Sequence, residues 1–281
     1  SAEVFSRVLF KAVTKYMLGL SATLDRQDGL TKVFKMFLGD VEAKWKRGAQ
    51  ENVIVKVIEY QNDDFGYGSE LTNYRGQPDF VKMITKICEY SFRTEFILSI
   101  VEKTWKETHT QIMVIGHRKK QLTYIHDAIK HRGFATVGYY IGGMKESELK
   151  ITEGKDIVIA TYTMAEEALD IKSLGTIVMS TPKKDVRQAV GRIMRSGGDK
   201  LVIDILDQHS IFRRHWDKRR RWYNSQNYTI MHTTYDGYHN NEWTQLKSKR
   251  RGKKTSKSNK LSVKTQPYDS VIKFSGKCLL D

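Results

Sequence analysis

The feature that most constrains the fold is the repeated alternation of short apolar runs with amphipathic segments. Apolar runs typical of strands occupy residues 52–60, 111–116, 135–140, 156–161 and 176–180, and another starts at residue 201. Strands that are apolar along their whole length are buried on both faces, as in parallel sheets with crossover helices. The sequence therefore predicts an α/β fold whose parallel sheet is covered by helices on both faces. Such sheets bind their ligands at the carboxyl ends of the strands.

The chain divides into three regions by pattern. Residues 1–48 carry a predicted helix (1–15), a predicted buried strand (16–20) and a predicted helix with one apolar side (25–37). Because this region has too few strands to cover its apolar side, we expect it to expose an apolar face when it stands alone.

Residues 49–230 hold the alternating pattern, and residues 231–281 form a basic tail that we expect to be partly disordered. Within the first of these regions, the polar, glycine-rich stretch 62–76 predicts a long loop, and 80–107 carries two helical patterns. The tail includes KSKRRGKKTSKSNK at 247–260, a flexible polycation that would add salt-sensitive affinity for nucleic acid. A nuclear-localisation signal is the alternative for that stretch.

Bulk composition points to a polyanionic partner inside the cell. The 281 residues carry a formal net charge of +16, which favours nucleic acid over a surface that is basic only for solubility. No apolar run reaches the length of a membrane span, and no signal-peptide pattern is present. Cys88 and Cys278 lack zinc spacing and are expected to be reduced thiols, so we expect an intracellular, reducing compartment and no metal site built from this chain.

The most informative motif lies at 187–195, RQAVGRIMR. On a helix, Arg192 and Arg195 are three residues apart and point the same way. Their guanidinium groups match phosphate oxygens, Gln188 lies on the same edge, and Gly191 allows a close approach to a ligand. Taken alone, the string also fits an ordinary basic helix with a packing glycine.

The neighbours of this motif favour the phosphate-binding interpretation. An apolar run ends at Thr161, an acidic helical turn follows, and Leu-Asp-Ile closes the segment at 169–171; a second apolar run ends at the Thr181-Pro182 breaker. Near the N-terminus stands Ser-Ala-Thr at 21–23. In order, these segments resemble motifs III, V and VI of superfamily 2 helicases, and the resemblance extends from about residue 1 to about residue 230.

The segments VGYYIGGMKE and TYTMAEEALDIKSLGTIVMSTPKKDVRQAVGRIMR are most similar to helicases of large nucleocytoplasmic DNA viruses related to the poxvirus transcript-release helicase. Ala168 departs from that family, which usually has glycine there. The chain has no G-x-x-x-x-G-K-[ST] phosphate loop and no acidic metal-binding box. The resemblance therefore implies the C-terminal portion of a helicase: a second RecA-like lobe with a remnant of the first.

The resemblance also implies a nucleotide site between two lobes. ATP would lie there with Mg²⁺ held by the missing first lobe, in cis or in trans, and this chain alone would be inactive. Arg195 and Arg192 would contact the γ-phosphate, one of them as an arginine finger, and Gln188 would sense the phosphate or hold the arginines. Asp170 would accept a hydrogen bond from a ribose hydroxyl, and Glu167 would pair with an arginine of the helix at 187–195 or remain solvated.

Further residues are expected to contact nucleic acid or to link it to ATP. Thr161 would meet a phosphate through its hydroxyl and amide, and the segment Gly116, His117 and Arg118 would grip the same backbone where motif IV is expected. An uncharged loop histidine is the alternative for His117. Gly142 and Gly143 would offer bare amides to phosphates or form a plain turn. Ser21 and Thr23 would couple hydrolysis to lobe movement.

The basic segment 212–228, FRRHWDKRRRWYNSQNY, predicts a helix with two possible uses. Arg219, Arg220 and the interleaved aromatic residues suit phosphate contact with base stacking. Alternatively, Phe212, Trp216 and Tyr223 dock the helix on the sheet while the arginines are solvated. The two uses are compatible, and all the expected contacts involve the nucleic-acid backbone, so strong sequence specificity is not expected.

The resemblance implies an ATP-dependent DNA helicase or translocase of viral origin that acts in transcription or DNA metabolism. DNA is expected rather than RNA, the transcription machinery is a further candidate partner, and no membrane is involved. A viral protein of this kind would act in the host cytoplasm, in the virus factory or in the virion. The alternative is a non-catalytic nucleic-acid-binding module derived from a helicase lobe, which the absent phosphate loop favours and the intact residues of 187–195 oppose. A Rossmann-type enzyme is disfavoured because no G-x-G-x-x-G follows a first strand.

Overall fold

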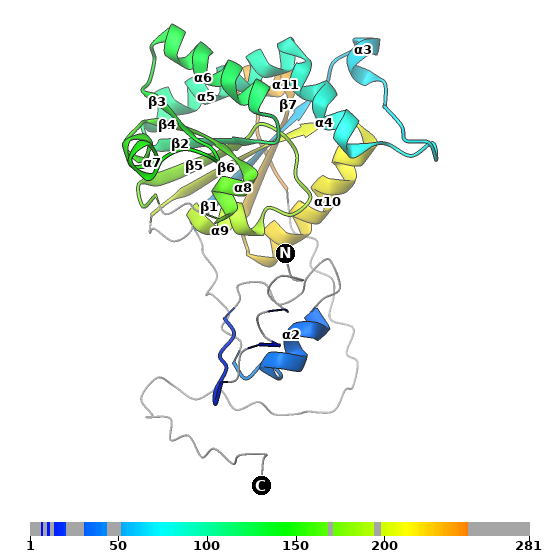
Figure 1. The fold of residues 1–281 in the computed structure, drawn as a ribbon. Helices are drawn as coiled ribbons and strands as arrows, with labels where there is room; N and C mark the ends of the chain where they lie inside the picture. The colour runs from blue at the N-terminus through cyan, green and yellow to red at the C-terminus, as the bar shows by residue number, and fades with distance from the viewer. Residues whose placement is uncertain are drawn as a thin grey trace. The chain divides into compact units, whose positions relative to one another are not determined.

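The computed structural model describes residues 7, 10–11, 14–20, 31–43, 52–167, 171–193 and 198–246 (Figure 1). Its helices are α2 (Thr31–Leu38), α3 (Phe65–Gly68), α4 (Phe80–Glu89), α5 (Ser91–Thr108), α6 (Lys119–Arg132), α7 (Glu146–Glu153), α8 (Tyr162–Glu167), α9 (Arg187–Ile193), α10 (Ser210–Ser225) and α11 (Tyr235–His239). Its strands are β1 (Val53–Tyr60), β2 (Gln111–Gly116), β3 (Val137–Tyr140), β4 (Ile157–Thr161), β5 (Leu174–Met179), β6 (Lys200–Asp207), β7 (Thr229–Thr234) and β8 (Thr244–Gln245).

The strands form one sheet in the order β3-β4-β2-β5-β6-β1-β7-β8. All neighbouring strands are parallel except β7 and β8, which are antiparallel. The predicted parallel sheet covered on both faces is therefore confirmed. Since the strands run the same way, the residues that follow β2, β4 and β5 meet at one edge, which positions the candidate site.

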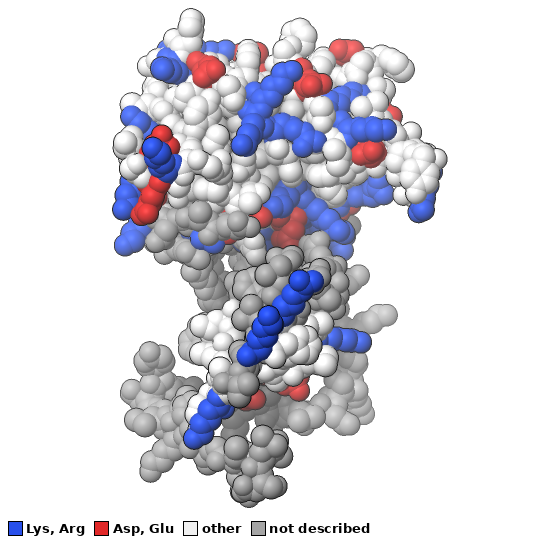
Figure 2. Space-filling view, viewed as in Figure 1, with Lys and Arg blue, Asp and Glu red and all other residues white. Residues whose placement is uncertain are grey.

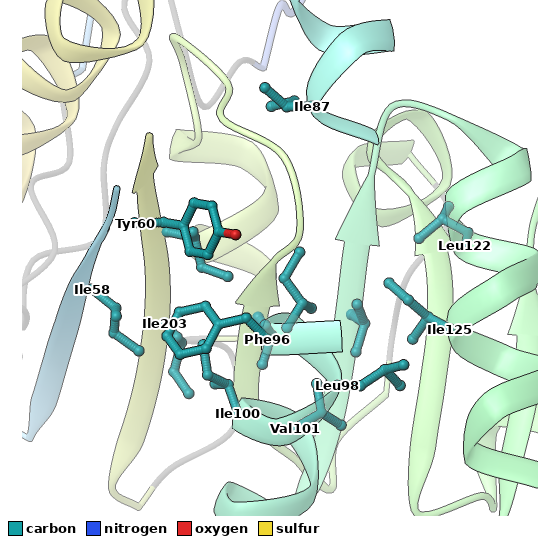
Figure 3. Close-up of a cluster of buried hydrophobic side chains, with 14 of the residues drawn as sticks. Ile58, Tyr60, Ile87, Phe96, Leu98, Ile100, Val101, Leu122, Ile125 and Ile203 are labelled. Atoms are coloured by element: carbon teal, nitrogen blue, oxygen red, sulfur yellow. The ribbon is translucent and has the colours of Figure 1, made fainter. Parts of the chain in front are cut away.

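Two apolar cores lie on the two faces of the sheet because successive strand residues point to opposite sides. Along β1, Val55 and Val57 join one core, whereas Ile58 and Tyr60 join the other. Helices α4, α5, α6 and α11 cover the second face, and α7, α8 and α9 lie on the first (Figure 1). Helix α10 packs on the first face through Trp216 and Tyr223, while Ile211 and Phe212 at its start reach the second core. Figure 3 shows part of the second core, where Phe96 from α5 lies among aliphatic side chains of the sheet and of α6.

The predicted loop at 62–76 contains more structure than the sequence indicated. It includes α3 and an antiparallel bridge between Thr72 and Pro78, with a turn closed by Gly76 at φ +70°. The Asp79 side chain then accepts hydrogen bonds from the amides of Val81 and Lys82 and caps the start of α4. Because local side-chain contacts stabilise this segment, its sequence lacks the regular apolar spacing from which a helix or strand is predicted.

The sheet does not end at residue 230, so that predicted boundary is wrong. Strand β7 starts at Thr229 and pairs with β1 from Ile54 to Glu59, and β8 adds a short edge. Ile230 is buried beneath this pairing. The partner of β7 lies more than 150 residues earlier, between 54 and 59, and such a distant pairing leaves no local signal.

The predicted strand at 16–20 is also not observed. Tyr16, Leu18 and Leu20 have no regular structure, and 81%, 84% and 87% of their surfaces are exposed. A strand needs a neighbour for its backbone hydrogen bonds, and no strand in the described parts of the chain pairs with this segment.

In the same N-terminal region, Phe10 and Met36 are exposed as well. Within the predicted helix 25–37, α2 is observed from Thr31; residues 25–30 and most of the predicted helix 1–15 lie outside the described residues. None of the helices in the described ranges is long and apolar enough to cross a membrane.

Candidate nucleotide and nucleic-acid site

Three strand ends converge at the carboxyl edge of the sheet. The backbone N–H of His117, just after β2, donates to the hydroxyl of Thr181 after β5 at 3.1 Å, and the His117 Nδ1 lies 2.8 Å from the same oxygen. The His117 ring also packs against Tyr162, the first residue after β4, with ring centroids 4.6 Å apart. The topology thus brings the strand ends of the expected motifs IV and V together with the Thr181-Pro182 breaker that precedes 187–195.

The His117 side chain is neutral at physiological pH. Burial, followed by the nearby charges of Lys183 and Arg118, lowers the pKa of His117 to about 4. The hydroxyl of Thr181 accepts from the His117 amide, so its proton is available for Nδ1, which fits a neutral ring protonated on Nε2. The uncharged alternative therefore describes His117 better than a charged grip on phosphate.

A second neutral histidine lies beside the first. Phe80 from α4 contacts the rings of His117 and His215, at centroid distances of 5.7 Å and 5.1 Å. Burial, together with Arg219 and neighbouring lysines, lowers the pKa of His215 to about 4. Burial, with a smaller contribution from nearby basic side chains, thus keeps both imidazoles uncharged at this edge.

Tyr162 and Lys183 connect α8 to the segment that follows β5. The buried Tyr162 hydroxyl donates to the Thr181 carbonyl at 2.6 Å, and burial raises the pKa of Tyr162, so the hydroxyl keeps its proton. Lys183 lies 4.9 Å from the centre of the Tyr162 ring and forms a 2.5 Å ion pair with Glu166 of α8. The only sequence signal for these contacts is that Tyr162 follows Thr161 and that Lys183 follows the Thr181-Pro182 breaker.

Helix α9 places its apolar residues inward and its polar residues outward. Ala189 and Val190 are buried, Gln188 is exposed and Arg192 is half-buried. A Cβ atom built at Gly191 would have no neighbouring atom within 4 Å. Among the described residues, nothing packs against the Cβ position of Gly191, so the surface of α9 is open at this point.

Several predicted nucleotide contacts lie outside the described residues. These are Asp170, Arg195, the side chain of Glu167 and the coupling residues Ser21 and Thr23. Ala168, the departure from the family pattern, also lies there. The described part of α9 therefore supplies Gln188 and Arg192 as the nucleotide-facing candidates.

Three of the predicted nucleic-acid contacts are accessible beside α8. Thr161 is half-buried at the end of β4, and Gly142 and Gly143 are exposed in the loop after β3. Gly143 has φ +92°, a conformation that favours glycine. A Cβ on Gly142 would come within 4.0 Å of the Met164 sulfur in α8, which places this loop near that helix.

Gly116 and Arg118 make contacts within the fold. Gly116 is buried, and a Cβ there would lie 2.4 Å from the Ser180 hydroxyl oxygen, so the prediction of a nucleic-acid contact is wrong for Gly116. The Arg118 guanidinium donates to the Thr85 hydroxyl at 3.0 Å and to the Val81 carbonyl at 3.2 Å. This guanidinium is turned toward α4.

The prediction of a nucleic-acid contact is also wrong for Arg219. Its side chain is fully buried and binds Asp204 of β6 through two hydrogen bonds, 2.7 and 2.8 Å long. Buried residues of α10 recur at Phe212, Trp216, Arg219 and Tyr223, which is the helical spacing of a docked face. The docking alternative is thus correct for this face, and it includes an arginine.

The outer side of α10 remains basic. Its exposed cations are Arg213, Arg214, Lys218 and Arg221. Arg220 is half-buried and lines an open groove of about 380 Å³ together with Trp216, Asp217 and His232. Lysine and arginine side chains are spread over the face shown in Figure 2, including the region of α10, and acidic ones are less widespread there. Arg220 therefore stays available for a contact with polyanions.

Within the described ranges, no group of three histidine, cysteine, aspartate or glutamate side chains is arranged to hold a metal ion. The outward face of α9 does suit the phosphate end of a nucleotide. It combines an amide side chain, an arginine and a backbone position without obstruction at Gly191.

The mostly parallel sheet flanked by helices on both faces is similar to the RecA-like domains of helicases. The fold is similar to that of S. cerevisiae Dbp5 bound to RNA and ADP BeF3, with a TM-score of 0.57 and 13% identity over 85% of this chain and 56% of that one. The expected RecA-like fold is confirmed by this likeness.

The chain is also similar in sequence to proteins of large DNA viruses. The chain is 34% identical over 240 residues to protein L396 of Acanthamoeba polyphaga mimivirus, and the aligned region covers 82% of this chain and 46% of that protein. It is 25% identical over 260 residues to protein QP509L of African swine fever virus, covering 80% and 48%. Both carry the name of an ATP-dependent RNA helicase. The chain spans about half the length of these relatives, and no protein-family model matches it.

Proposed function

We propose that this chain is the second RecA-like lobe of a superfamily 2 helicase or translocase that hydrolyses ATP and moves along nucleic acid. The outward face of α9 is the observation that carries the proposal. Gln188 and Arg192 are directed away from the core, and Gly191 leaves the surface between them open. A helix kept only for packing would not need an unfilled glycine position there, since glycine costs about 1 kcal/mol of helix stability relative to alanine.

In the complete protein, this face would approach ATP bound to the first lobe. When bound, ATP supplies the free energy of its hydrolysis for movement along nucleic acid. The first lobe would hold the Mg²⁺ ion that accompanies the nucleotide. Arg192 and Arg195 would stabilise the charge that develops on the phosphate, and Gln188 would orient them. Asp170 would accept a hydrogen bond from the ribose, and Glu167 would pair with an arginine of α9.

The nucleic-acid strand would lie beside α8 and the loop after β3. Thr161, Gly142 and Gly143 would contact its phosphates, with Arg220 and the exposed cations of α10 adding charge. His117 would act as a neutral part of the floor of this site. Ser21 and Thr23 would couple hydrolysis to movement of the lobes. These contacts fall on the backbone, so we expect little dependence on base sequence.

We expect the nucleic acid to be DNA and the process to be viral transcription or DNA metabolism within the infected cell. The names of the two relatives point to RNA instead. Competition between single-stranded DNA and single-stranded RNA of the same sequence, at fixed salt, distinguishes the two. Preferential displacement of a labelled strand by DNA supports the first assignment, and preference for RNA overturns it.

The arginine assignment is tested by Arg192→Ala and Arg195→Ala in the full-length protein. An arginine finger contributes about 10³–10⁵ in turnover, so one of the variants should lose most of its ATP hydrolysis while its nucleic-acid binding is retained. Arg187→Ala is the matched control, because Arg187 belongs to α9 but binds Asp185 at 2.6 Å. Near-normal hydrolysis in both test variants contradicts the assignment.

The main alternative is a module that binds nucleic acid without hydrolysing ATP. Photocrosslinking with an azido-ATP separates the two functions. Crosslinks in the α9 segment that unlabelled ATP abolishes support a nucleotide site, and their absence from a protein that still binds nucleic acid supports the binding module.

A further inference from the structure

The linker Ser180–Lys183 between β5 and the start of α9 is held by its backbone carbonyls. The Arg93 Nη1 donates to the Ser180 carbonyl at 2.8 Å, and the Arg219 Nη1 donates to the Lys183 carbonyl at 2.7 Å. Between them, the Tyr162 hydroxyl donates to the Thr181 carbonyl at 2.6 Å. Three carbonyls in a stretch of four residues thus receive a buried or partly buried side-chain donor.

The two arginines are themselves fixed by aspartates of β6. Arg219 forms two hydrogen bonds with Asp204, and Arg93 binds Asp207 through both Nε and Nη2. All four side chains are completely buried. Burial alone would lower the pKa of each arginine, but the facing carboxylate raises it above the usual value, so both stay charged.

The pairs act from opposite faces of the sheet. Asp204 and Asp207 are three positions apart on β6, and strand residues at odd separations point to opposite sides. Arg93 comes from α5 on one face, whereas Arg219 comes from α10 on the other. The linker therefore accepts hydrogen bonds from arginines on both faces of the sheet, at the point where the chain leaves β5.

Stability alone does not account for this arrangement. A buried ion pair replaced by apolar residues of similar volume often leaves stability unchanged or raises it. A guanidinium bound to a carboxylate by two of its nitrogens, however, aims the third in a fixed direction. In both pairs that third nitrogen meets a linker carbonyl.

Further contacts connect the linker and the residues after it to the neighbouring helices α8 and α9. Lys183 pairs with Glu166 of α8, and the Asp185 carboxylate accepts a hydrogen bond from the Arg187 amide at the start of α9. We propose that Arg93 and Arg219 are positioning residues, which fix the Ser180–Lys183 linker and thereby the direction in which α9 presents Gln188 and Arg192. Only the link to catalysis rests on the proposed function.

The test uses the double variant Asp204→Leu with Arg219→Met in the full-length protein. It removes the donor to the Lys183 carbonyl without leaving a buried charge unpaired, so the melting temperature should change little. Hydrogen exchange of the peptide covering 181–193 should accelerate at least about tenfold, the effect of losing about 1.4 kcal/mol of local protection. Peptides from β1 and β2 should keep their protection.

The kinetic readout is ATP hydrolysis stimulated by single-stranded nucleic acid. A displacement of about 1 Å can cost about 10²-fold in rate, so we expect a fall in kcat of that order with little change in the affinity for nucleic acid. Glu95→Gln with Arg132→Gln is the control, because it removes an α5–α6 ion pair that touches no linker carbonyl. Tyr162→Phe, which removes only the donor to Thr181, should give a smaller effect in the same peptide and serves if the double variant does not fold.

Unchanged exchange at 181–193 in the double variant and in Tyr162→Phe overturns the proposal. Faster exchange with an unchanged kcat also overturns it, because the linker would then be held without consequence for α9. If the wild-type protein hydrolyses no ATP, the proposed function fails, and the exchange experiment alone decides whether the arginines fix the linker.

Discussion

The imidazole Nδ1 of His117 lies 2.8 Å from the hydroxyl oxygen of Thr181 and joins the ends of β2 and β5 at the carboxyl edge of the sheet. Protonation of His117 would place two donors at this contact, because the Thr181 hydroxyl already directs its proton to Nδ1. The contact therefore depends on a neutral ring, and burial lowers the pKa of His117 to about 4.

This relationship predicts a stability that depends on pH. In the unfolded chain the histidine pKa is about 6.5, so between about pH 6.5 and pH 4 the unfolded state binds a proton that the folded state does not. The free energy of unfolding should therefore fall as the pH drops through this window, by at most about 1.4 kcal/mol per pH unit for one histidine. Urea denaturation of the chain at a series of pH values measures the slope.

The control for this prediction is His117→Asn, which keeps a polar side chain that does not titrate. Its slope should be shallower than that of the wild type, though not flat, because the pKa of His215 is also lowered. Equal slopes in the two proteins contradict the assignment of the titration to His117.

A second prediction concerns Gly116→Ala. The added methyl would lie 2.4 Å from the Ser180 hydroxyl, which donates to the Ile115 carbonyl at 2.9 Å, and 3.2 Å from Leu122. Relief requires movement of a buried strand end, so we expect a loss of about 1–3 kcal/mol in the free energy of unfolding. Gly191→Ala, with no atom near the new methyl, should be neutral or raise stability by up to about 1 kcal/mol. Similar losses in both variants would show that Gly116 is not a packing position.

A third prediction follows for the function of Gly191. If the open face of α9 receives phosphates, Gly191→Ala in the full-length protein should lower kcat/KM for ATP by about tenfold or more, because a methyl displaces the reacting groups. Its thermal stability should be no lower than that of the wild type. Unchanged kinetics would mean that the nucleotide does not approach α9 at this point.

A fourth prediction separates two neighbouring arginines of α10. Arg219→Ala leaves Asp204 as an unpaired buried carboxylate, which should cost about 3–5 kcal/mol of stability. Arg220→Ala should leave stability nearly unchanged and weaken binding to a single-stranded oligonucleotide, with a reduced dependence of affinity on salt. Chemical denaturation and salt titration of binding check the two halves. The reverse pattern contradicts the orientation of α10.

The main sheet could be predicted because each strand carries its signal locally. The apolar runs at 111–116, 157–161 and 174–179 are almost entirely buried, and in the run at 53–60 most of the apolar residues are buried. Helical patterns lie between these runs, as parallel strands require. Strand β7 escaped prediction because TIMHTT is polar at four of its six positions and gains its stability from pairing with β1. Conversely, the segment 16–20 is apolar enough for a strand but has no described strand to pair with.

The site could be predicted in outline but not in its individual contacts. The outward position of Gln188 and Arg192 followed from helical periodicity, and the meeting of strand ends followed from a parallel sheet. The burial of Arg219 depends on Asp204, and the packing of Gly116 depends on Ser180. Neither partner is adjacent in sequence, so the basic composition of 212–228 suggested a nucleic-acid contact for Arg219, and the expected position of motif IV suggested one for Gly116.

The most direct test of the central claim is the rate of ATP hydrolysis by the full-length protein with and without single-stranded DNA or RNA. The account predicts a rate that rises severalfold when a strand is added and that returns to the background when the arginines of α9 are removed. A protein that binds the strand but hydrolyses no ATP under either condition contradicts the helicase assignment and leaves a nucleic-acid-binding module.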